Sequence, residues 1–522
     1  MKEEILLLLT FLFWFLHIAK RLLSSLYFWQ LKEYRIGRVS QDINKKRIIF
    51  PKSAFLALIF IFLSFIFDGI IPIIYFVFIL YFVLGILAGY QAIKNNWHFP
   101  LFTVKMLLLF GINLFLLLGF IMYFYKYVFF LLIFEIIFFV FVSISIILIQ
   151  FPTFFIKKLI QYKAKKKIEK FKDLTVIGIT GSFGKSSTKE FLYSILSTEY
   201  NVLKTEGNVN TEIGIANTVL KKLKPSHEIF ICEMGAYKRG EIREICNIVK
   251  PKIGILTEIG QQHIGLFGSM DNIVKAKFEL IDSLPEDGVA ILNWDNSFIK
   301  KNYVFKENTI KYSVNRKANI FSKNVKVEKD KLSFEVFSSD KNSAKFELNV
   351  LGKHNIPNIL AALSCVKLFG INLKKASSIL KKGKIKNPME LKRGLNKTNI
   401  IDASYSANPK GVIAHLEYLK SWKKKRIIVM PCLIELGNRA KEEHEILGKK
   451  IGEVCDLAII TTPDYFEDLK KGVFKMGMKN ENILFMQDAD LIFNKIKDYN
   501  NAEDVILFES RVPEKLKKLF LK

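Results

Sequence analysis

The chain has 522 residues, half of them hydrophobic, with 47 phenylalanines and a formal net charge of +29. The length allows about three domains, and the phenylalanine count points to contact with lipid, which disfavours a wholly soluble protein. The positive charge would suit nucleic acid, an anionic membrane or phosphorylated ligands. The basic residues are spread widely and form no recognition module, so we expect no nucleic-acid partner.

The first 156 residues are predicted to form an α-helical membrane domain of about five spans. Apolar runs occupy about 5–19, 53–67, 69–90, 106–125 and 127–151. The first two are shorter than the roughly 20 residues that a span requires. Lys20 and Arg21 at the end of the first run could extend it by snorkelling.

Lys and Arg residues set the predicted orientation, because they favour the cytoplasmic side of a membrane. They gather in segments 20–52 and 157–173, whereas the turn at 68–72 has none. Five spans with the N terminus outside fit this pattern and place everything after residue 157 in the cytoplasm. We therefore predict a multi-pass protein of the cell (inner) membrane. The basic linker 157–173 either contacts anionic lipid headgroups or forms a solvated helix.

The five cysteines are scattered, and none forms a CxxC pair. This spacing disfavours a zinc ribbon and fits reduced thiols in a cytosol. They are Cys232, Cys246, Cys365, Cys432 and Cys455.

A short apolar strand, Val176–Thr180, leads into a glycine-containing loop, and a helical pattern follows from Thr188 to about Leu196. A strand, a glycine loop and a helix in this order can bind phosphate, because backbone N–H groups at the start of the helix point at the anion. We expect the loop lysine to neutralise ATP phosphates and the serine after it to hold Mg²⁺. The strict pattern needs a glycine where Ile179 stands, so the loop is a shortened variant. The loop residues are Gly181, Ser182, Phe183, Gly184, Lys185, Ser186 and Ser187.

Further motifs follow in a fixed order. They are Gly207–Asn210, Glu233–Ala236, His263 with Phe267–Ser269, Lys275–Lys277, Asn293–Asn296, Gly352–Asn355, Ser404–Pro409, Glu435–Gly437 with His444, and Ser510–Arg511. Together with the glycine loop, they resemble the Mur ligases of cell-wall peptide synthesis over about residues 174–515. The motifs that begin at Glu233, Ser404 and Glu435 are most similar to the branch that adds D-alanyl-D-alanine.

The resemblance implies an α/β fold in two parts after the membrane helices. These are a P-loop-type Mur ligase central domain at 174–390 and a Rossmann-like C-terminal domain at 391–522. Strand-like alternation at Val325, Val327, Leu332, Phe334 and Val336 predicts a β-rich insert near 304–350 in the central domain.

The resemblance also assigns roles, with ATP and Mg²⁺ as cofactors. The catalytic candidates are Lys185, Glu233, His263 and Lys277. The metal-ligand candidates are Ser186, Glu233, His263 and Lys277. Besides the loop, the nucleotide candidates are Asn293, Asp295, His354, Asn355 and Asp402. The candidates for contact with the wall precursor or the amine are Asn208, Asn210, Tyr405, Asn408 and Arg511.

The residues themselves support part of this assignment. Glu233 follows the apolar strand Ile229–Cys232, and His263 follows Ile253–Ile259. Such a carboxylate and imidazole are structural more often than not, but at strand ends downstream of a phosphate loop they favour a metal site. The lysine of the family that matches Lys277 is often carbamoylated, and the alternative here is a solvated surface lysine. The nucleotide candidates Asn293, Asp295, His354 and Asn355 could equally cap turns.

Three motifs depart from the family pattern. Asp402-Ala403-Ser404-Tyr405 lacks one carboxylate, Asn387-Pro388-Met389-Glu390 lacks an arginine, and Phe508-Glu509-Ser510-Arg511 replaces Lys-Gly-Ser-Arg. Asp402 and Arg393 are candidates to substitute. Most of these changes fall in the C-terminal domain, so they leave the amine's identity open.

The largest departure lies at the front, where membrane spans occupy the place of the family's UDP-binding domain. The precursor is therefore either lipid-linked, or its UDP group is held differently. The spans either anchor the enzyme or bind a polyprenyl-linked substrate. We favour anchoring because the spans carry few polar residues, mainly His17, Asp68, Asn113 and Glu135.

Three functions compete. The first is ATP-dependent addition of D-alanyl-D-alanine to a peptidoglycan precursor through an acyl-phosphate. The second is a related ligation in another polymer, such as poly-γ-glutamate or a pseudomurein peptide. The third is a catalytically decayed membrane scaffold, against which the intact Lys185, Ser186, Glu233 and His263 argue.

Overall fold

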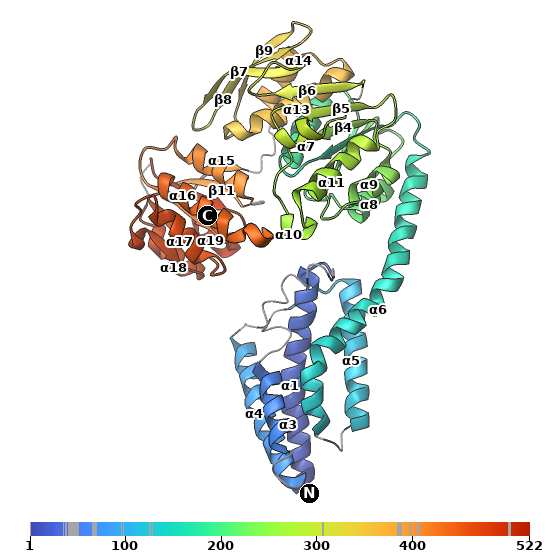
Figure 1. The fold of residues 1–522 in the computed structure, drawn as a ribbon, viewed down its shortest axis with the longest axis vertical. Helices are drawn as coiled ribbons and strands as arrows, with labels where there is room; N and C mark the ends of the chain where they lie inside the picture. The colour runs from blue at the N-terminus through green and yellow to red at the C-terminus, as the bar shows by residue number, and fades with distance from the viewer. Residues whose placement is uncertain are drawn as a thin grey trace. The chain divides into compact units, whose positions relative to one another are not determined.

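The chain forms two compact units, Met1–Lys158 and Leu159–Lys522 (Figure 1). The computed structural model describes residues 2–34, 36, 39, 52–64, 70–94, 97, 99–124, 127, 129–304, 307–383, 389–395, 398–404, 408–499 and 503–521.

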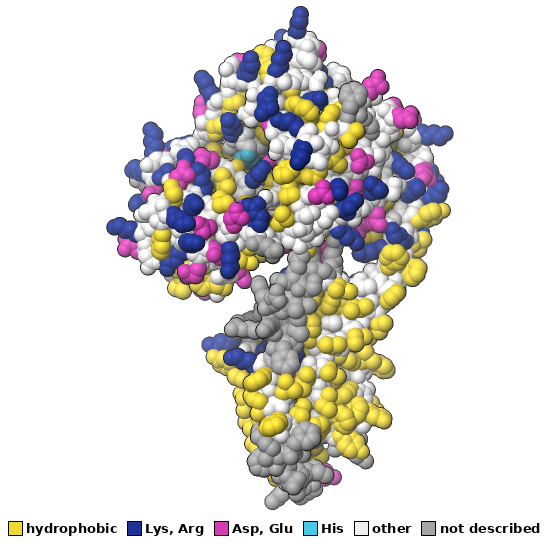
Figure 2. Space-filling view, in the orientation of Figure 1, with side chains coloured by type: hydrophobic (Ala, Val, Ile, Leu, Met, Phe, Trp, Pro, Cys, Tyr) yellow, Lys and Arg dark blue, Asp and Glu magenta, His cyan; other side chains and the backbone are white. Residues whose placement is uncertain are grey.

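The N-terminal unit is helical, as predicted. Its helices are α1 (Lys2–Leu31), α3 (Lys52–Ser64), α4 (Ile70–Ile93), α5 (Val104–Phe124) and the first part of α6 (Phe129–Ile168). Four of these contain a stretch that is long and apolar enough to cross a membrane, and the helical stretch Lys52–Phe62 is apolar but shorter. Figure 2 shows apolar side chains over much of the visible face of this unit. Among the described residues, four helices therefore reach spanning length, and the fifth predicted span remains a prediction.

Polar groups inside the helical unit pair with one another. The buried Glu135 carboxylate accepts hydrogen bonds from Arg21 at 2.5 Å and lies 3.1 Å from the His17 ring. Asn113 and Ser145 are hydrogen-bonded across two helices at 2.8 Å. Asp68 lies outside the described residues. These pairs join α1 and α5 to α6, so their first role is to hold helices together.

Helix α6 corrects the predicted linker. It continues without a break past residue 151 to Ile168, so most of segment 157–173 is helical. Ile160, Ala164 and Ile168 are spaced by one helical turn and pack into the core of the following domain. The Lys167 ammonium donates to the carbonyl of Leu220 at 2.9 Å. The end of α6 is therefore part of the α/β unit and is not a wholly solvated helix, whereas contact with lipid headgroups stays a prediction.

The middle domain is built on one nine-stranded sheet with the order β2-β3-β1-β4-β5-β6-β7-β8-β9. Neighbouring strands from β2 to β7 are parallel, and β7, β8 and β9 are antiparallel. The strands are β1 (Thr175–Thr180), β2 (Val202–Lys204), β3 (Ile229–Glu233), β4 (Ile253–Leu256), β5 (Val289–Asn293), β6 (Thr309–Ser313), β7 (Ile320–Val327), β8 (Leu332–Ser338) and β9 (Ser343–Leu348).

The predicted β-rich insert is a continuation of this sheet. β6 pairs with β5, and the three last strands extend the same sheet at one edge. The predicted alternation holds in β8, where Leu332, Phe334 and Val336 are buried. It is wrong in β7, where Val327 is exposed and Val325 is only partly buried, because a register shift interrupts the pairing between Lys323 and Lys326.

Helices cover both faces of the middle sheet (Figure 1). One core contains side chains from α7, α13 and α14, and the other contains side chains from α8, α9, α11 and α12 with the end of α6. These and the shorter helices are α7 (Lys185–Leu196), α8 (Glu212–Lys222), α9 (Glu241–Val249), α10 (Ile264–Phe267), α11 (Met270–Asp282), α12 (Ser297–Asn302), η1 (Lys353–Asn355), α13 (Ile356–Val366), η2 (Lys367–Phe369) and α14 (Leu373–Lys382).

The C-terminal domain has a six-stranded sheet with the order β10-β11-β15-β12-β13-β14, and only the edge strand β10 is antiparallel. Helices α15, α16 and α17 contribute to one core, and α18 and α19 to another. The elements are β10 (Glu390–Arg393), β11 (Asn399–Ala403), α15 (Pro409–Leu419), β12 (Arg426–Met430), η4 (Gly437–Arg439), α16 (Ala440–Val454), β13 (Leu457–Ile460), α17 (Phe466–Phe474), η5 (Asn480–Asn482), β14 (Ile483–Phe485), α18 (Ala489–Ile496), β15 (Val505–Glu509) and α19 (Glu514–Phe520). The five cysteines are buried and free.

Candidate active site

The glycine loop joins the central strand β1 to α7, as the sequence predicts. Gly181 and Gly184 have φ of 153° and 81°. A Cβ at Gly181 would lie 2.1 Å from the Thr257 hydroxyl, and one at Gly184 would lie 2.2 Å from the Asn358 side-chain oxygen. Both positions therefore require glycine, and the loop backbone opens onto the start of α7.

Hydrogen bonds to the segment that follows β4 hold the glycine loop in place. The Ser182 hydroxyl donates to the Gly260 carbonyl at 2.9 Å, and the Thr257 hydroxyl donates to the Phe183 carbonyl at 2.6 Å. The Lys185 ammonium folds back onto the Gly181 carbonyl at 2.8 Å. Burial lowers the pKa of Lys185, and the nearby Glu233 carboxylate opposes that shift. Such a lysine is poised to exchange carbonyl contacts for an anion.

Glu233 ends β3 beside the loop and is buried in a network that the sequence did not predict. One carboxylate oxygen lies 2.9 Å from the Lys189 ammonium, and the other accepts from the Asn210 amide at 3.2 Å. Lys189 is 1% exposed and also donates to the Gly207 carbonyl at 2.9 Å. The signal was a lysine on the buried face of α7, four residues after Lys185. Asn210, a predicted substrate residue, thus lies against the predicted metal ligand.

His263 lies after β4, at the start of α10, with φ of 57°. Its Nδ1 is hydrogen-bonded to a carboxylate oxygen of Glu435 from the C-terminal domain. The Tyr237 ring packs edge-on against the imidazole, with centroids 4.8 Å apart. Burial lowers the pKa of His263, and Glu435 opposes the shift.

Lys277 is buried in α11, so the alternative of a solvated surface lysine is wrong. Its ammonium lies 5.8 Å from the centroid of the Phe267 ring. Burial is the main cause that lowers the pKa of Lys277 to about 7, and the charge of Lys185 adds to it. Near neutral pH a large share of this side chain is therefore an uncharged, nucleophilic amine. By contrast, Lys275 is exposed and paired with Asp271 at 2.6 Å.

The four catalytic candidates come from separate segments and act on one another electrostatically. Lys185 carries a charge that lowers the pKa of both His263 and Lys277, and Glu233 raises that of Lys185. Perturbed groups that converge beside a phosphate-type loop are typical of an active site. The fold thus gathers Lys185, Glu233, His263 and Lys277 at one end of the middle sheet.

The predicted nucleotide residues after β5 make local contacts. The Asn293 side chain accepts from the backbone of Asp295 at 3.1 Å. The Asp295 carboxylate accepts from the Ser313 hydroxyl and the Val314 backbone, both at 2.6 Å. These bonds cap the β5 turn and tie it to β6, so the structure supports a structural role for Asp295.

His354, which is partly buried, and the buried Asn355 form a pair beside the C-terminal domain. The Asn355 amide lies 3.2 Å from the His354 Nε2, and burial is the main cause that lowers the pKa of His354 to about 3. The ring of His415 on α15 lies 5.2 Å from that of His354. His415 in turn bonds the buried Glu509 carboxylate at 2.6 Å. The sequence identified Glu509 only as a departure from the family motif, and it did not predict this interdomain chain.

The candidates for contact with the precursor or the amine are dispersed, with Asn208 in the middle domain and Asn408 and Arg511 in the C-terminal domain. Asn408 caps the start of α15 by accepting from the Gly411 backbone at 2.8 Å. Arg511 and Asn208 are exposed. Tyr405 lies outside the described residues, and the proposed substitute Arg393 donates to the Asn399 side chain.

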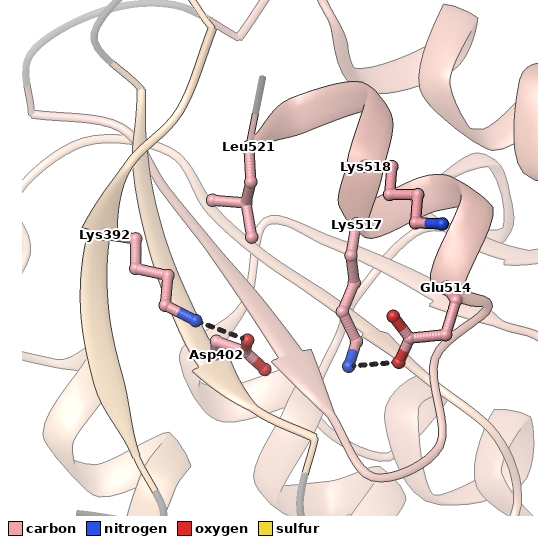
Figure 3. Close-up of a pocket in the computed structure, with 6 residues that line it drawn as sticks. All are labelled: Lys392, Asp402, Glu514, Lys517, Lys518 and Leu521. Carbon is pink, nitrogen blue, oxygen red and sulfur yellow. Dashed lines mark hydrogen bonds and ion pairs between the residues drawn. The ribbon is translucent and has the colours of Figure 1, made fainter. Parts of the chain in front are cut away.

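Asp402 lies in a shallow pocket of the C-terminal domain (Figure 3). Its carboxylate pairs with Lys392 at 2.9 Å and accepts from the Ser404 hydroxyl at 2.5 Å. Burial would raise the pKa of Asp402, but these two partners outweigh it and lower that pKa. The pocket is lined by Lys392, Asp402, Glu514, Lys517, Lys518 and Leu521.

The residues present fit ATP and Mg²⁺. The two glycines leave a cradle that a Cβ would fill, and the Lys185 ammonium donates to the Gly181 and Ser182 carbonyls, which an anion could replace. No cluster of three or more His, Cys, Asp or Glu side chains occurs in the part of the chain that the structure describes. Mg²⁺ commonly takes only one or two protein oxygens besides phosphates and water, so Ser186 and Glu233 would suffice.

Comparisons with known proteins agree with this geometry. Residues 179–366 match the family "Mur ligase middle domain", and residues 389–511 match "Mur ligase, glutamate ligase domain". The UDP-N-acetylmuramoyl-tripeptide–D-alanyl-D-alanine ligase of Bacillus subtilis (strain 168) is 29% identical over 347 residues, which are 66% of this chain and 74% of that protein. The enzyme of the same name from Buchnera aphidicola subsp. Acyrthosiphon pisum is 30% identical, over 58% of this chain and 67% of that protein.

A solved structure of the MurF ligase of Thermotoga maritima in complex with ADP is also similar. It is 26% identical with a TM-score of 0.62, and the match covers 70% of this chain and 84% of that chain. The fold and these relatives define the class of this protein as an ATP-dependent ligase. The chain belongs to the Mur ligase family.

Proposed function

We propose that this protein adds D-alanyl-D-alanine to a UDP-linked peptidoglycan precursor, at the cost of ATP. The observation that carries this proposal is the convergence of Lys185, Glu233, His263 and Lys277 beside the glycine loop, in a chain whose relatives bear that enzyme's name. We also propose that the loop acts as a phosphate loop and that the C-terminal domain is Rossmann-like.

The proposed chemistry proceeds in two steps. A carboxylate oxygen of the precursor attacks the γ-phosphorus of ATP, and ADP leaves. The amine nitrogen then attacks the carbonyl carbon of the acyl-phosphate and loses a proton to solvent. The carbon–oxygen bond to phosphate breaks, and phosphate leaves with that electron pair. Because negative charge gathers in both steps, catalysis depends mainly on positioning and on fixed positive charge.

Each residue of the cluster has a task in this proposal. Lys185 leaves its loop carbonyls and binds the phosphate oxygens. Ser186 and Glu233 would hold Mg²⁺, which neutralises phosphate charge when bound, and Lys189 keeps the Glu233 carboxylate in place. Lys277, uncharged in part near pH 7, would react with CO₂ to form a carbamate that serves as a further anionic ligand.

For the helical unit we propose a membrane anchor with the ligase domains in the cytoplasm. The pairing of Glu135 with Arg21 and of Asn113 with Ser145 supports this, because polar groups that pair with one another are not kept for a lipid pyrophosphate. Direct binding of a lipid-linked precursor remains the alternative that the truncation experiment below distinguishes.

A related ligase with a different amine is the second candidate. The buried Glu509 favours it, since a carboxylate stands where the family motif has glycine, at the carboxyl end of a central strand. A poly-γ-glutamate or pseudomurein-type ligase would keep the ATP cluster and differ at this place. The intact cluster disfavours a decayed scaffold.

The test is ligation by the full-length protein in detergent with MgATP, UDP-MurNAc-tripeptide and a panel of amines. We expect ADP release and a new peptide product with D-alanyl-D-alanine, and neither with Lys185→Ala. Product with a different amine only would favour the second candidate. ADP release that no precursor stimulates would overturn both.

A further inference from the structure

The middle and C-terminal domains meet at a contact that involves a catalytic candidate. Nδ1 of His263, from the middle domain, is hydrogen-bonded to the carboxylate of Glu435, from the C-terminal domain. The two residues are 172 positions apart in the sequence. Both are partly buried, with side-chain exposures of 26% and 27%, so solvent only partly screens the pair.

The backbone on both sides of this contact is strained. His263 and Glu435 have φ of 57° and 64°, a region that non-glycine residues seldom occupy. Such strain persists only where the surrounding structure fixes the residue, and it is common at functional sites. Here it turns the two side chains toward each other from different domains.

A glycine allows the close approach. Gly437 has φ of 56°, and a Cβ there would lie 2.9 Å from the Cα of Gly265. Any side chain at Gly437 would therefore push the Glu435 segment away from α10. The interdomain spacing at this point depends on the absence of a side chain.

The segment that carries Glu435 is held in place by His444 of the same domain. Buried His444 donates from Nδ1 to the Ala440 carbonyl at 2.5 Å and accepts the Leu433 backbone N–H at its Nε2, at 2.9 Å. The Tyr465 ring stacks on the His444 ring with centroids 4.5 Å apart. Contacts within the C-terminal domain thus help to fix the segment 433–437, which carries Glu435.

This arrangement has a specific consequence for His263. A carboxylate on Nδ1 fixes the proton on that nitrogen and leaves the Nε2 lone pair for a metal or a phosphate-bound group. Carboxylate partners of this kind orient histidines in many metal sites. Tyr237 packs against the same ring and restricts its rotation.

We propose that Glu435, supplied by the C-terminal domain, is a positioning residue for His263. Docking of that domain then sets the orientation of the His263 imidazole rather than the position of ATP or of the precursor. The inference rests on the proposed function of the cluster. It assigns a role to a residue outside the middle domain, and it makes the reactive geometry dependent on domain closure.

The experiment is a double-mutant cycle in the full-length protein with Glu435→Ala, His263→Ala and the double variant. One readout is kcat and KM for ATP, and the other is the Mg²⁺ midpoint for ADP binding, which needs neither precursor nor amine. We expect Glu435→Ala to lower kcat about 10- to 100-fold and to raise the Mg²⁺ midpoint. The double variant should be no worse than His263→Ala alone.

Matched variants separate positioning from simple structural loss. Glu503→Gln alters another interdomain pair, with Lys329 at 2.6 Å, and should leave both readouts unchanged. Glu435→Gln keeps an oxygen acceptor without the charge and should lie between wild type and Glu435→Ala. If Glu435→Ala does not fold, Glu435→Gln decides: a raised Mg²⁺ midpoint supports the proposal.

Two results would overturn the proposal. One is a Glu435→Gln or Glu435→Ala protein that folds and keeps both readouts at the wild-type values. The other is multiplication of the two single effects in the double variant, which would show that Glu435 does not act through His263. If His263→Ala itself had no effect, the proposed site would fail, and this inference with it.

Discussion

The ATP side and the amine side of this ligase differ in how their predicted residues lie. The four ATP-side candidates come from four segments of the middle domain, yet the charges of Lys185 and Glu233 shift the pKa values of their neighbours. These candidates are Lys185, Glu233, His263 and Lys277. On the amine side, Asn408 caps a helix and Arg511 is exposed.

This difference shows that short sequence motifs predict the ATP side better than the amine side. The chemistry of phosphate transfer needs a loop, lysines and carboxylates at strand ends, and parallel strands bring those ends together. Recognition of an amine depends on side chains that tertiary contacts bring together, such as His415 with Glu509. The five predictions that follow test this contrast.

The largest effect is expected from Lys185→Ala. Loss of the charge that stabilises the transferred phosphoryl group should lower turnover by at least about 100-fold. The measurement is ADP formation, with thermal unfolding to show that the fold is kept. The control is Lys221→Ala on the exposed side of α8, which should behave as wild type. Near-normal turnover by Lys185→Ala would remove the loop from the site.

Lys277→Ala tests the ATP side further and should lose about 10- to 100-fold in turnover. Short carboxylic acids should restore part of the activity, because they replace the carboxylate of the carbamate. Lys275→Ala, two residues earlier and exposed, is the control. Full activity of Lys277→Ala would show that the buried lysine has no catalytic role.

The same residue gives a pH prediction for the wild-type protein. CO₂ reacts with the uncharged amine, and the pKa of Lys277 is lowered to about 7. The carbamate should therefore form poorly well below pH 7 and increase as the pH rises through that value. Initial rates with and without bicarbonate from pH 6 to 8 should show this dependence, and Lys277→Ala should not respond to bicarbonate.

Lys189→Met should mainly affect stability. It leaves the Glu233 carboxylate buried without its 2.9 Å partner, which costs about 3–5 kcal/mol when a buried pair is broken. The double variant Lys189→Met with Glu233→Gln should recover part of this loss, since no charge is then left unpaired. Denaturant unfolding measures both. An unchanged midpoint in the single variant would mean that the carboxylate is not held as described.

The smallest effect is expected from removal of the membrane helices. A protein of residues 157–522 keeps Ile160, Ala164 and Ile168, which pack into the middle-domain core. If the helices only anchor the enzyme, this form should match the full-length rate on a soluble precursor within a few-fold, apart from lost effective concentration at the membrane. A folded, ATP-binding truncation that is inactive on soluble precursor would instead favour lipid recognition.

Much of the fold was predictable because its signals are local. The strand–glycine loop–helix around Gly184 and the apolar runs of the first unit follow from short patterns. The end of α6 was missed because its apolar positions are three residues in a lysine-rich segment, and only the docking of Ile168 reveals their use.

Within the site, the limits have the same origin. From the sequence, Asp295 could contact the nucleotide or cap a turn, and only its bonds to Ser313 and Val314 favour the cap. Lys189 and Glu435 gain their importance from partners far along the chain, Glu233 and His263. One sequence does not encode such pairs as a visible pattern.

The most direct test of the central claim, ligation through an acyl-phosphate, follows the oxygen atoms of the precursor carboxylate. The precursor is labelled with ¹⁸O in that carboxylate and incubated with the full-length protein, MgATP and the amine. Phosphorus NMR of the released phosphate should show one ¹⁸O atom per molecule, because the carboxylate oxygen that attacked ATP leaves with the phosphate. Unlabelled phosphate formed together with the peptide product would contradict the account.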